Sequence, residues 1–189
     1  GWYGAKTEVV GRFFGGSEKT GMGWDGVDYN TAYGINGADR RYNPAGEYTT
    51  TAADGSDSTA YYPNQTDNYA QQHAQLSITH RFTPQWSLAA TAHYTHGAGY
   101  YEQYKRKKLS YWGLPYSHKA YGMYRKQLDN HFFGGVLAAK YISEPVDLQF
   151  GGAANYYLGD HFGTLHYLED SLILPVNYEY YRNNARKTD

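Results

Sequence analysis

Apolar and polar side chains alternate along two stretches of the chain. From His73 to Phe82 every second residue is apolar, with His80 as the exception, and the alternation resumes at Trp86 after Thr83-Pro84-Gln85. Successive side chains of a β-strand point to opposite faces of the sheet. The pattern therefore predicts a hairpin with one apolar face, made by Ala74, Leu76, Ile78, Phe82, Trp86, Leu88, Ala90, Ala92 and Tyr94.

A second stretch repeats this design around Ser143-Glu144-Pro145. Its apolar positions are Phe133, Leu137, Ala139, Tyr141, Val146, Leu148, Phe150, Ala154 and Tyr156. A less regular strand is expected near the start of the chain, whereas the segment 159–189 has a mixed pattern, for which a loop entering another strand is the default. The sequence thus predicts an all-β fold, an antiparallel up-and-down meander with strands near 4–18, 70–82, 85–100, 129–142 and 146–159.

The connections between these strands alternate in length. Turns of about three residues at Thr83-Pro84 and Glu144-Pro145 should lie on one rim, and long links of roughly 15–70 and 97–130 on the other. Irregular links longer than ~15 residues are uncommon in compact soluble domains. Short turns on one rim and long loops on the other are typical of outer-membrane barrels. We therefore expect a partial transmembrane β-barrel, about five strands of a larger one, with long extracellular loops.

Such a barrel wall should carry its aromatic residues at two levels. Phe82, Trp86 and Tyr141 should mark the level near the short turns, and Tyr94, Phe133 and Tyr156 the second level. Between them the apolar side chains should be exposed, because they would face lipid. The opposite face should line the interior with Gln75, Ser77, Thr79, Ser87, Thr91, Gln149 and Asn155.

The amino-acid composition excludes several kinds of partner and site. The 189 residues include 23 Tyr and 22 Gly, a net charge of -1 and no Cys. The charge gives no electrostatic case for a nucleic-acid partner, and the absence of Cys excludes disulfides and thiolate metal sites. The chain contains no run of ~18 apolar residues, so no membrane-spanning helix is predicted. Both ends lack the signals of a natural start or stop, so we expect residues 1–189 to be an internal fragment of one domain.

Candidate chemistry is sparse. His93 and His96 lie three apart on a strand and should point to opposite faces, so no metal site and no cofactor are expected. No nucleophile elbow or acid–base pair indicates an enzyme. The runs 25–30 and 54–58 hold oxygen-bearing side chains at short spacing, which leaves a calcium site in the loops open. Neither run has the later bidentate Glu of a calcium loop, and turns explain both more simply. Ligand recognition is expected in the loop that follows the first hairpin, with Tyr100, Tyr101, Tyr104 and Trp112 as aromatic contacts and Lys105 and Arg106 as anion contacts.

Several segments together resemble TonB-dependent outer-membrane receptors of the siderophore-receptor type. They are Ser17-Glu18-Lys19-Thr20 with Gly23-Trp24-Asp25-Gly26-Val27, Thr66-Asp67-Asn68-Tyr69, 88–105 and Leu128-Asp129-Asn130-His131-Phe132. The resemblance covers about 5–158. It implies a barrel of the Gram-negative outer membrane, in contact with lipid, whose plug domain meets TonB and is absent from this chain. It also implies import of a scarce ligand, such as a ferric siderophore or another iron complex, while cobalamin, haem or a glycan remain open.

Two other classes remain open at this point. A secreted β-sandwich that binds carbohydrate through Tyr and Trp would explain the alternation and the aromatics, but explains the short-turn, long-loop layout poorly. A fragment of a polysaccharide-degrading enzyme would lack an identifiable catalytic pair. Exposure of Leu76, Leu88, Leu148 and Phe150 separates the barrel from the sandwich, because a sandwich covers them with a second sheet.

Overall fold

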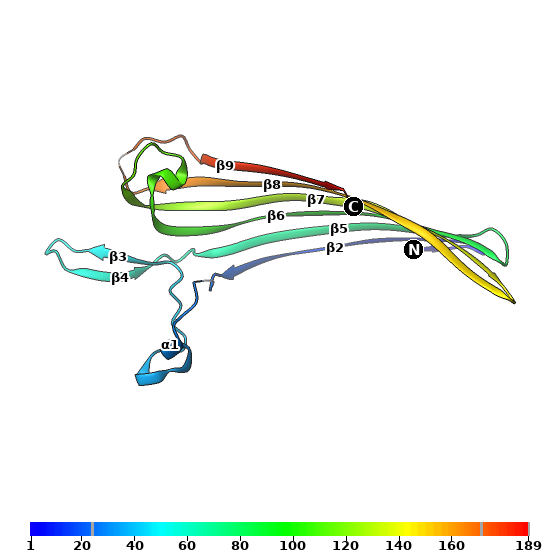
Figure 1. Cartoon of the computed structure of the whole chain (residues 1–189), viewed down its shortest axis with the longest axis horizontal. Helices are drawn as coiled ribbons and strands as arrows, with labels where there is room; N and C mark the ends of the chain where they lie inside the picture. Colours follow the sequence, from blue (N-terminus) through cyan, green and yellow to red (C-terminus); the bar gives the residue numbers. More distant parts are fainter. Residues whose placement is uncertain (24, 171, 189) are drawn as a thin grey trace.

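The computed structural model describes residues 1–23, 25–170 and 172–188. Trp24, which belongs to one of the segments that resemble the receptors, lies outside the described residues, as do Ser171 and Asp189. Within the described residues the chain forms one antiparallel sheet of seven strands in sequence order, and a separate hairpin of two (Figure 1). The sheet contains β1 (Trp2–Tyr3), β2 (Thr7–Gly21), β5 (Thr66–Arg81), β6 (Trp86–Lys108), β7 (Lys119–Ser143), β8 (Val146–Leu168) and β9 (Tyr178–Thr188). The all-β antiparallel meander predicted from the alternation is therefore confirmed, while the sheet is open and not closed into a barrel.

Both short turns lie at the same end of the sheet. One joins Arg81 to Trp86 and the other joins Ser143 to Val146, and a backbone hydrogen bond of 2.9 Å from Ile142 N–H to the Gln85 carbonyl ties the two turns together. The connections at the other end are longer (Figure 1). They are 22–65, which holds α1 (Tyr29–Tyr33), η1 (Ile35–Gly37) and the hairpin β3 (Glu47–Thr51)–β4 (Asp57–Tyr61), then 109–118 with η2 (Leu109–Trp112), and 169–177.

The strands extend further toward the long connections than the alternation predicts. β6 continues to Lys108 and β7 begins at Lys119, so the expected link of 97–130 is wrong and shrinks to ten residues. The strand β9 agrees with the loop entering another strand that is expected in 159–189, although β8 first continues to Leu168. These extensions mix polar and aromatic residues with a few aliphatic ones, so no regular apolar–polar alternation marks them. Cross-strand pairs of aromatic and charged side chains hold them instead.

The register places the apolar side chains in rows on one face, called here the apolar face. One row pairs Trp86 with Tyr141 and Leu148, and a row eight residues along pairs Tyr94 with Phe133 and Tyr156. Between these rows lie Leu76, Ile78, Leu88, Ala90, Ala92, Gly135, Leu137, Ala139, Phe150, Gly152 and Ala154. Trp86 and Tyr141 therefore lie at a different level from Tyr94, Phe133 and Tyr156, as the sequence predicts. Phe82, the third residue expected at the first level, lies in the short turn and its backbone N–H bonds to the Trp86 carbonyl.

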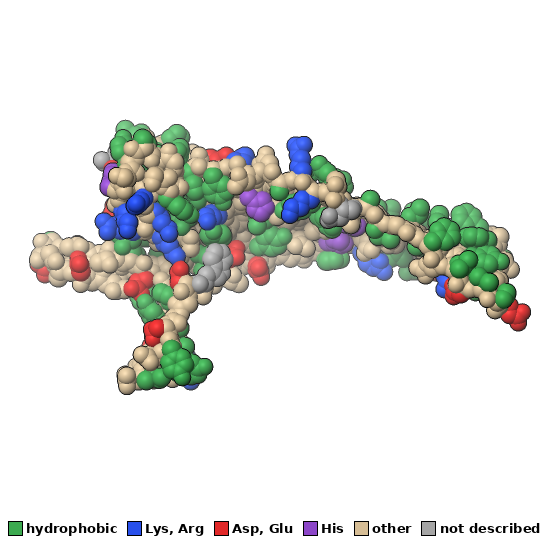
Figure 2. Space-filling model, in the orientation of Figure 1, with side chains coloured by type: hydrophobic (Ala, Val, Ile, Leu, Met, Phe, Trp, Pro, Cys, Tyr) green, Lys and Arg blue, Asp and Glu red, His purple; other side chains and the backbone are tan. Residues whose placement is uncertain are grey.

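We call the part from the short turns up to the Tyr94 row the lower half, and the part beyond it the upper half. In the lower half the apolar face is bare: Leu76 is 48% exposed, Leu148 55% and Phe150 60%. Hydrophobic side chains gather at this end in Figure 2, whereas a cluster of Lys and Arg lies at the other. Every described side chain that is buried, including Trp112, Tyr124 and Leu165, belongs to the upper half or its connections. No helix among the described residues is long and apolar enough to cross a membrane.

Candidate functional site

The six residues expected to contact a ligand do not form one site. Five of them lie on β6 and not in a loop, because the strand continues past the point where its alternation ends. Neighbouring side chains on a strand alternate between faces. Tyr100, Tyr104 and Arg106 consequently lie on the side of the apolar face, and Tyr101 and Lys105 on the opposite side.

Trp112 is a correction to the expected ligand contacts. Its side chain is fully buried and packs against Tyr124 and Leu165. The short helix η2 carries the indole over Gly122, where the absence of a side chain leaves room for it. In this arrangement Trp112 forms the core of the upper half and has no surface to offer a ligand.

Tyr100, Tyr101 and Lys105 are engaged by other parts of the chain. The Arg125 guanidinium lies 4.1 Å from the Tyr100 ring centre, and the Lys126 ammonium 5.8 Å from that of Tyr101. The Lys105 ammonium pairs with Asp25 at 2.8 Å. These cation–π contacts and this ion pair bind neighbouring strands and the first long connection together.

Tyr104 and Arg106 line an open groove of about 750 Å³ between the β3–β4 hairpin and the upper ends of β6 and β7. Tyr104 stacks on Tyr121, with ring centres 5.2 Å apart, and meets the edge of Tyr48. The remaining lining residues are Thr49, Thr50, Thr51, Asp57 and Glu169. Aromatic faces beside hydroxyl groups and one guanidinium suit a flat or ring-shaped ligand with polar or anionic substituents.

Hydrogen bonds fix the walls of this groove. The backbone N–H of Thr49 donates to the Tyr121 hydroxyl at 3.3 Å, and the backbone N–H of Tyr121 donates to the Glu169 carboxylate at 3.1 Å. Burial, and then the nearby carboxylate of Glu169, raise the pKa of Tyr104 to about 12. The Tyr104 hydroxyl therefore remains protonated at neutral pH and can donate a hydrogen bond.

Behind the groove, the buried carboxylate of Glu102 joins three segments. It accepts hydrogen bonds from the Tyr62 hydroxyl, from Asn64 Nδ2 at 2.5 Å and from Arg125 Nε at 2.6 Å. Although burial by itself would raise the pKa of Glu102, these three donors outweigh it and hold the pKa below its ordinary value. The ionised carboxylate anchors the end of the first long connection to β6 and β7, and so positions the hairpin that forms one wall of the groove.

The acidic runs in the first long connection serve as caps and turns. The Asp28 carboxylate accepts from Thr31 N–H at 3.1 Å and caps α1, and the Asp54 carboxylate accepts from Ser56 N–H at 2.9 Å. These bonds match the turn explanation that the sequence favours.

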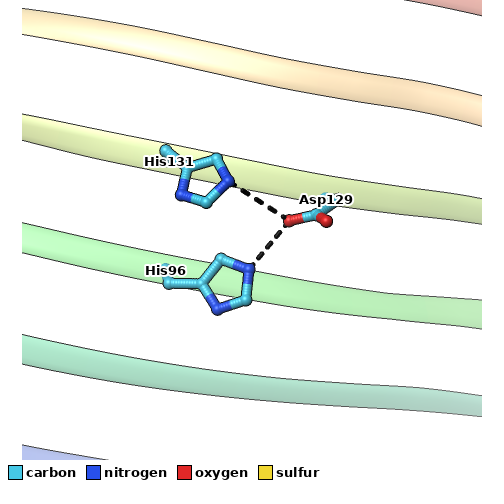
Figure 3. Close-up of side chains that lie close together, drawn as sticks. All are labelled: His96, Asp129 and His131. Atoms are coloured by element: carbon cyan, nitrogen blue, oxygen red, sulfur yellow. Dashed lines mark hydrogen bonds and ion pairs between the residues drawn. The ribbon is translucent and has the colours of Figure 1, made fainter.

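A histidine–carboxylate cluster was not anticipated. His96 on β6 lies opposite His131 on β7, and Asp129 lies two residues along β7 on the same face (Figure 3). His96 Nε2 is 2.8 Å from Asp129 Oδ1, and His131 Nε2 is 3.7 Å from the same oxygen. The sequence correctly places His93 and His96 on opposite faces of the strand. It does not reveal how β6 and β7 are aligned, and only that alignment brings His131 beside His96. Among the described residues, His96, Asp129 and His131 are the three side chains whose ligand atoms lie close enough together to hold a metal ion.

Comparisons of the chain with protein-family models, with curated proteins and with solved structures gave no match.

Proposed function

We propose that this chain is part of the wall of a TonB-dependent receptor of the Gram-negative outer membrane, which imports a ferric siderophore or another iron complex. The proposal combines the family resemblance of the sequence with the exposed apolar face of the sheet. The plug domain that would contact TonB lies outside this chain. In this interpretation the apolar face contacts lipid, and the short turns lie on the periplasmic rim.

The observation that carries the proposal is the bare apolar face between two aromatic rows. An exposed apolar patch wider than a few hundred Å² is rare on a soluble monomer. Here the patch spans β5, β6, β7 and β8. From Trp86 to Tyr94 is nine residues inclusive, which is within the usual length of a tilted transmembrane β-strand. Rows of Trp, Tyr and Phe at both borders are the expected interfacial girdles.

The carbohydrate-binding sandwich is less well supported. Its inner face needs a second sheet over residues such as Leu76, Leu148 and Phe150. All three are exposed, Leu88 is half-buried, and the β3–β4 hairpin lies at the far end of the strands (Figure 1).

The ligand class rests on the resemblance, and the groove around Tyr104 offers a place for part of such a ligand. An iron complex with aromatic or anionic groups would stack on the paired rings of Tyr104 and Tyr121 and meet the guanidinium of Arg106. Loops and strand ends on a rigid sheet commonly carry binding sites.

Two adjacent residues test the proposed lipid contact. Leu137 lies on the apolar face midway between the aromatic rows, at 52% exposure, and Val136 lies on the opposite face at 47%. We expect Leu137→Arg to cost about 2–4 kcal/mol of folding free energy in the membrane, and Val136→Arg to be tolerated in a polar interior. The measurement is the amount of folded, outer-membrane-embedded protein in Gram-negative cells that make the complete receptor.

Val136→Arg is the matched control, because both substitutions add the same charge at nearly the same exposure. In a water-soluble protein neither arginine would meet lipid, and the two variants would behave alike. Equal amounts of folded protein for the two variants would therefore contradict the proposal.

A further inference from the structure

We propose that His96, Asp129 and His131 form a binding site for a divalent transition-metal ion of the Zn²⁺ class. The site lies on the apolar face, one row beyond Tyr94 and Phe133, where the sheet surface changes from apolar to polar. This inference uses only the geometry of β6 and β7, and it holds whether or not the chain belongs to a membrane receptor.

The ligands are brought together by strand register. His96 and His131 are directly paired across β6 and β7, and their rings are 4.8 Å apart at an angle of 21°. Asp129 precedes His131 by two residues, so its side chain lies on the same face beside both rings (Figure 3). The three ligand atoms lie within 4.8 Å of one another.

These distances are close to those of a tetrahedral zinc site. Ligands placed ~2.0–2.1 Å from Zn²⁺ lie about 3.3 Å from each other. The carboxylate oxygen is 2.8 Å from His96 Nε2 and 3.7 Å from His131 Nε2. Small rotations of the two rings would therefore close the site. The three side chains are 32%, 50% and 40% exposed, which leaves an approach for the ion and a fourth position for water.

Tyr94 acts as a positioning residue for His131. Its hydroxyl lies 2.7 Å from His131 Nδ1. If that hydroxyl accepts the Nδ1 proton, the lone pair of His131 is left on Nε2, the atom that faces Asp129. Partners of this kind orient metal-binding histidines and fix their tautomer.

The donor set selects the class of ion. Two imidazole nitrogens and one carboxylate oxygen suit Zn²⁺ and its neighbours in the transition series, whereas Mg²⁺ and Ca²⁺ prefer all-oxygen sites. A second histidine pair provides an internal comparison. His73 and His93 stack with ring centres 6.4 Å apart, but His93 bonds to the amide of Asn155 and not to a carboxylate.

Calorimetric titration of the chelator-treated, purified protein with ZnCl₂ tests the site. We expect one Zn²⁺ per chain, and binding at least about 100-fold weaker in His131→Ala and in Asp129→Asn. The matched control is His93→Ala, which removes an imidazole from the opposite face of β6 and should leave the affinity unchanged. Far-UV circular dichroism of each variant verifies that the sheet is retained.

Tyr94→Phe tests the arrangement without removing a ligand. It should retain one Zn²⁺ per chain with affinity reduced about 10–100-fold. With Co²⁺ in place of Zn²⁺, the visible spectrum should show tetrahedral nitrogen and oxygen coordination in the unsubstituted protein, and should lose it in His131→Ala. The proposal is overturned if the unsubstituted protein binds Zn²⁺ no more tightly than His131→Ala, or if His93→Ala weakens binding as strongly.

Discussion

The lower and upper halves of the sheet are built from the same strands but are stabilised differently. In the lower half the described side chains are partly or fully exposed, and Leu148 and Phe150 lie bare. In the upper half the chain covers both faces of its own sheet. The end of the first long connection packs beside Glu102 and Tyr104 on one face, and η2 places Trp112 on the other. The upper half thus contains its own core, whereas the lower half requires its surroundings to cover it.

The largest contrast should come from the core of the upper half. Trp112→Ala removes a fully buried indole from Tyr124 and Leu165, and we expect it to cost about 3–5 kcal/mol. Tyr116→Ala in the same connection removes a ring that is 44% exposed and should cost less than about 1 kcal/mol. Denaturant unfolding followed by near-UV circular dichroism measures both. A similar cost for the two variants would mean that η2 is not a core element.

The second largest effect on stability is expected from the buried carboxylate of Glu102. Glu102→Gln removes the charge that Arg125, Tyr62 and Asn64 surround, and we expect a local loss of about 2–3 kcal/mol. Faster amide hydrogen exchange at 62–66 would report it. The exposed pair of Lys140 and Asp147, 3.4 Å apart in the lower half, is the control, and Asp147→Asn should cost less than about 1 kcal/mol.

The same carboxylate predicts a pH dependence. Because the pKa of Glu102 is held below its ordinary value of 4.5, its contribution to stability is complete above that value. It is lost as the pH falls further, through the lowered pKa of the folded state. The protection factors at 62–66, which are corrected for the intrinsic exchange rate at each pH, should therefore fall in acid in the unsubstituted protein. The Glu102→Gln variant should show no such fall, and an unchanged acid response in that variant would assign the effect to another group.

Alanine substitutions at two glycines, one in each half, should differ in their effect on stability by a smaller amount. A methyl group on Gly122 would lie 2.6 Å from the Trp112 ring, whereas one on Gly152 would meet nothing within 4 Å. We expect Gly122→Ala to destabilise the upper half by about 1–3 kcal/mol and Gly152→Ala to be tolerated. Thermal unfolding of the two variants gives the difference, and a harmless Gly122→Ala would show that the indole packs elsewhere.

The sequence predicts the lower half well, because one face of each strand is apolar and the period of two is visible. Both short turns, the two aromatic rows and the direction of Leu76 and Leu148 follow from that period. The period of two does not predict the upper half, because residues such as Tyr100 and Lys105 contact partners on neighbouring strands or in distant connections. The alternation of apolar and polar residues carries no information about such pairs.

The candidate sites were harder to foresee for the same reason. Tyr104 and Arg106 are two of the six expected ligand contacts, and both line the groove. Tyr48 reaches the groove only through the folding of the first long connection, and Tyr121 only through the register of β7 on β6. His131 could be matched to His96 only with the register of β6 and β7. That register depends on a ten-residue connection that the sequence suggested to be about thirty residues long.

The pairing of the inner strands also constrains the order of assembly. Along their lower parts, β5, β6 and β7 each pair with a strand on both sides. Along an edge strand about half of the N–H and C=O groups point outward. In hydrocarbon each unpaired group costs several kcal/mol, a total far above the stability of a single domain. If the proposed receptor is correct, each of these strands must have its neighbours before or during entry into the bilayer, and the wall cannot insert one strand at a time.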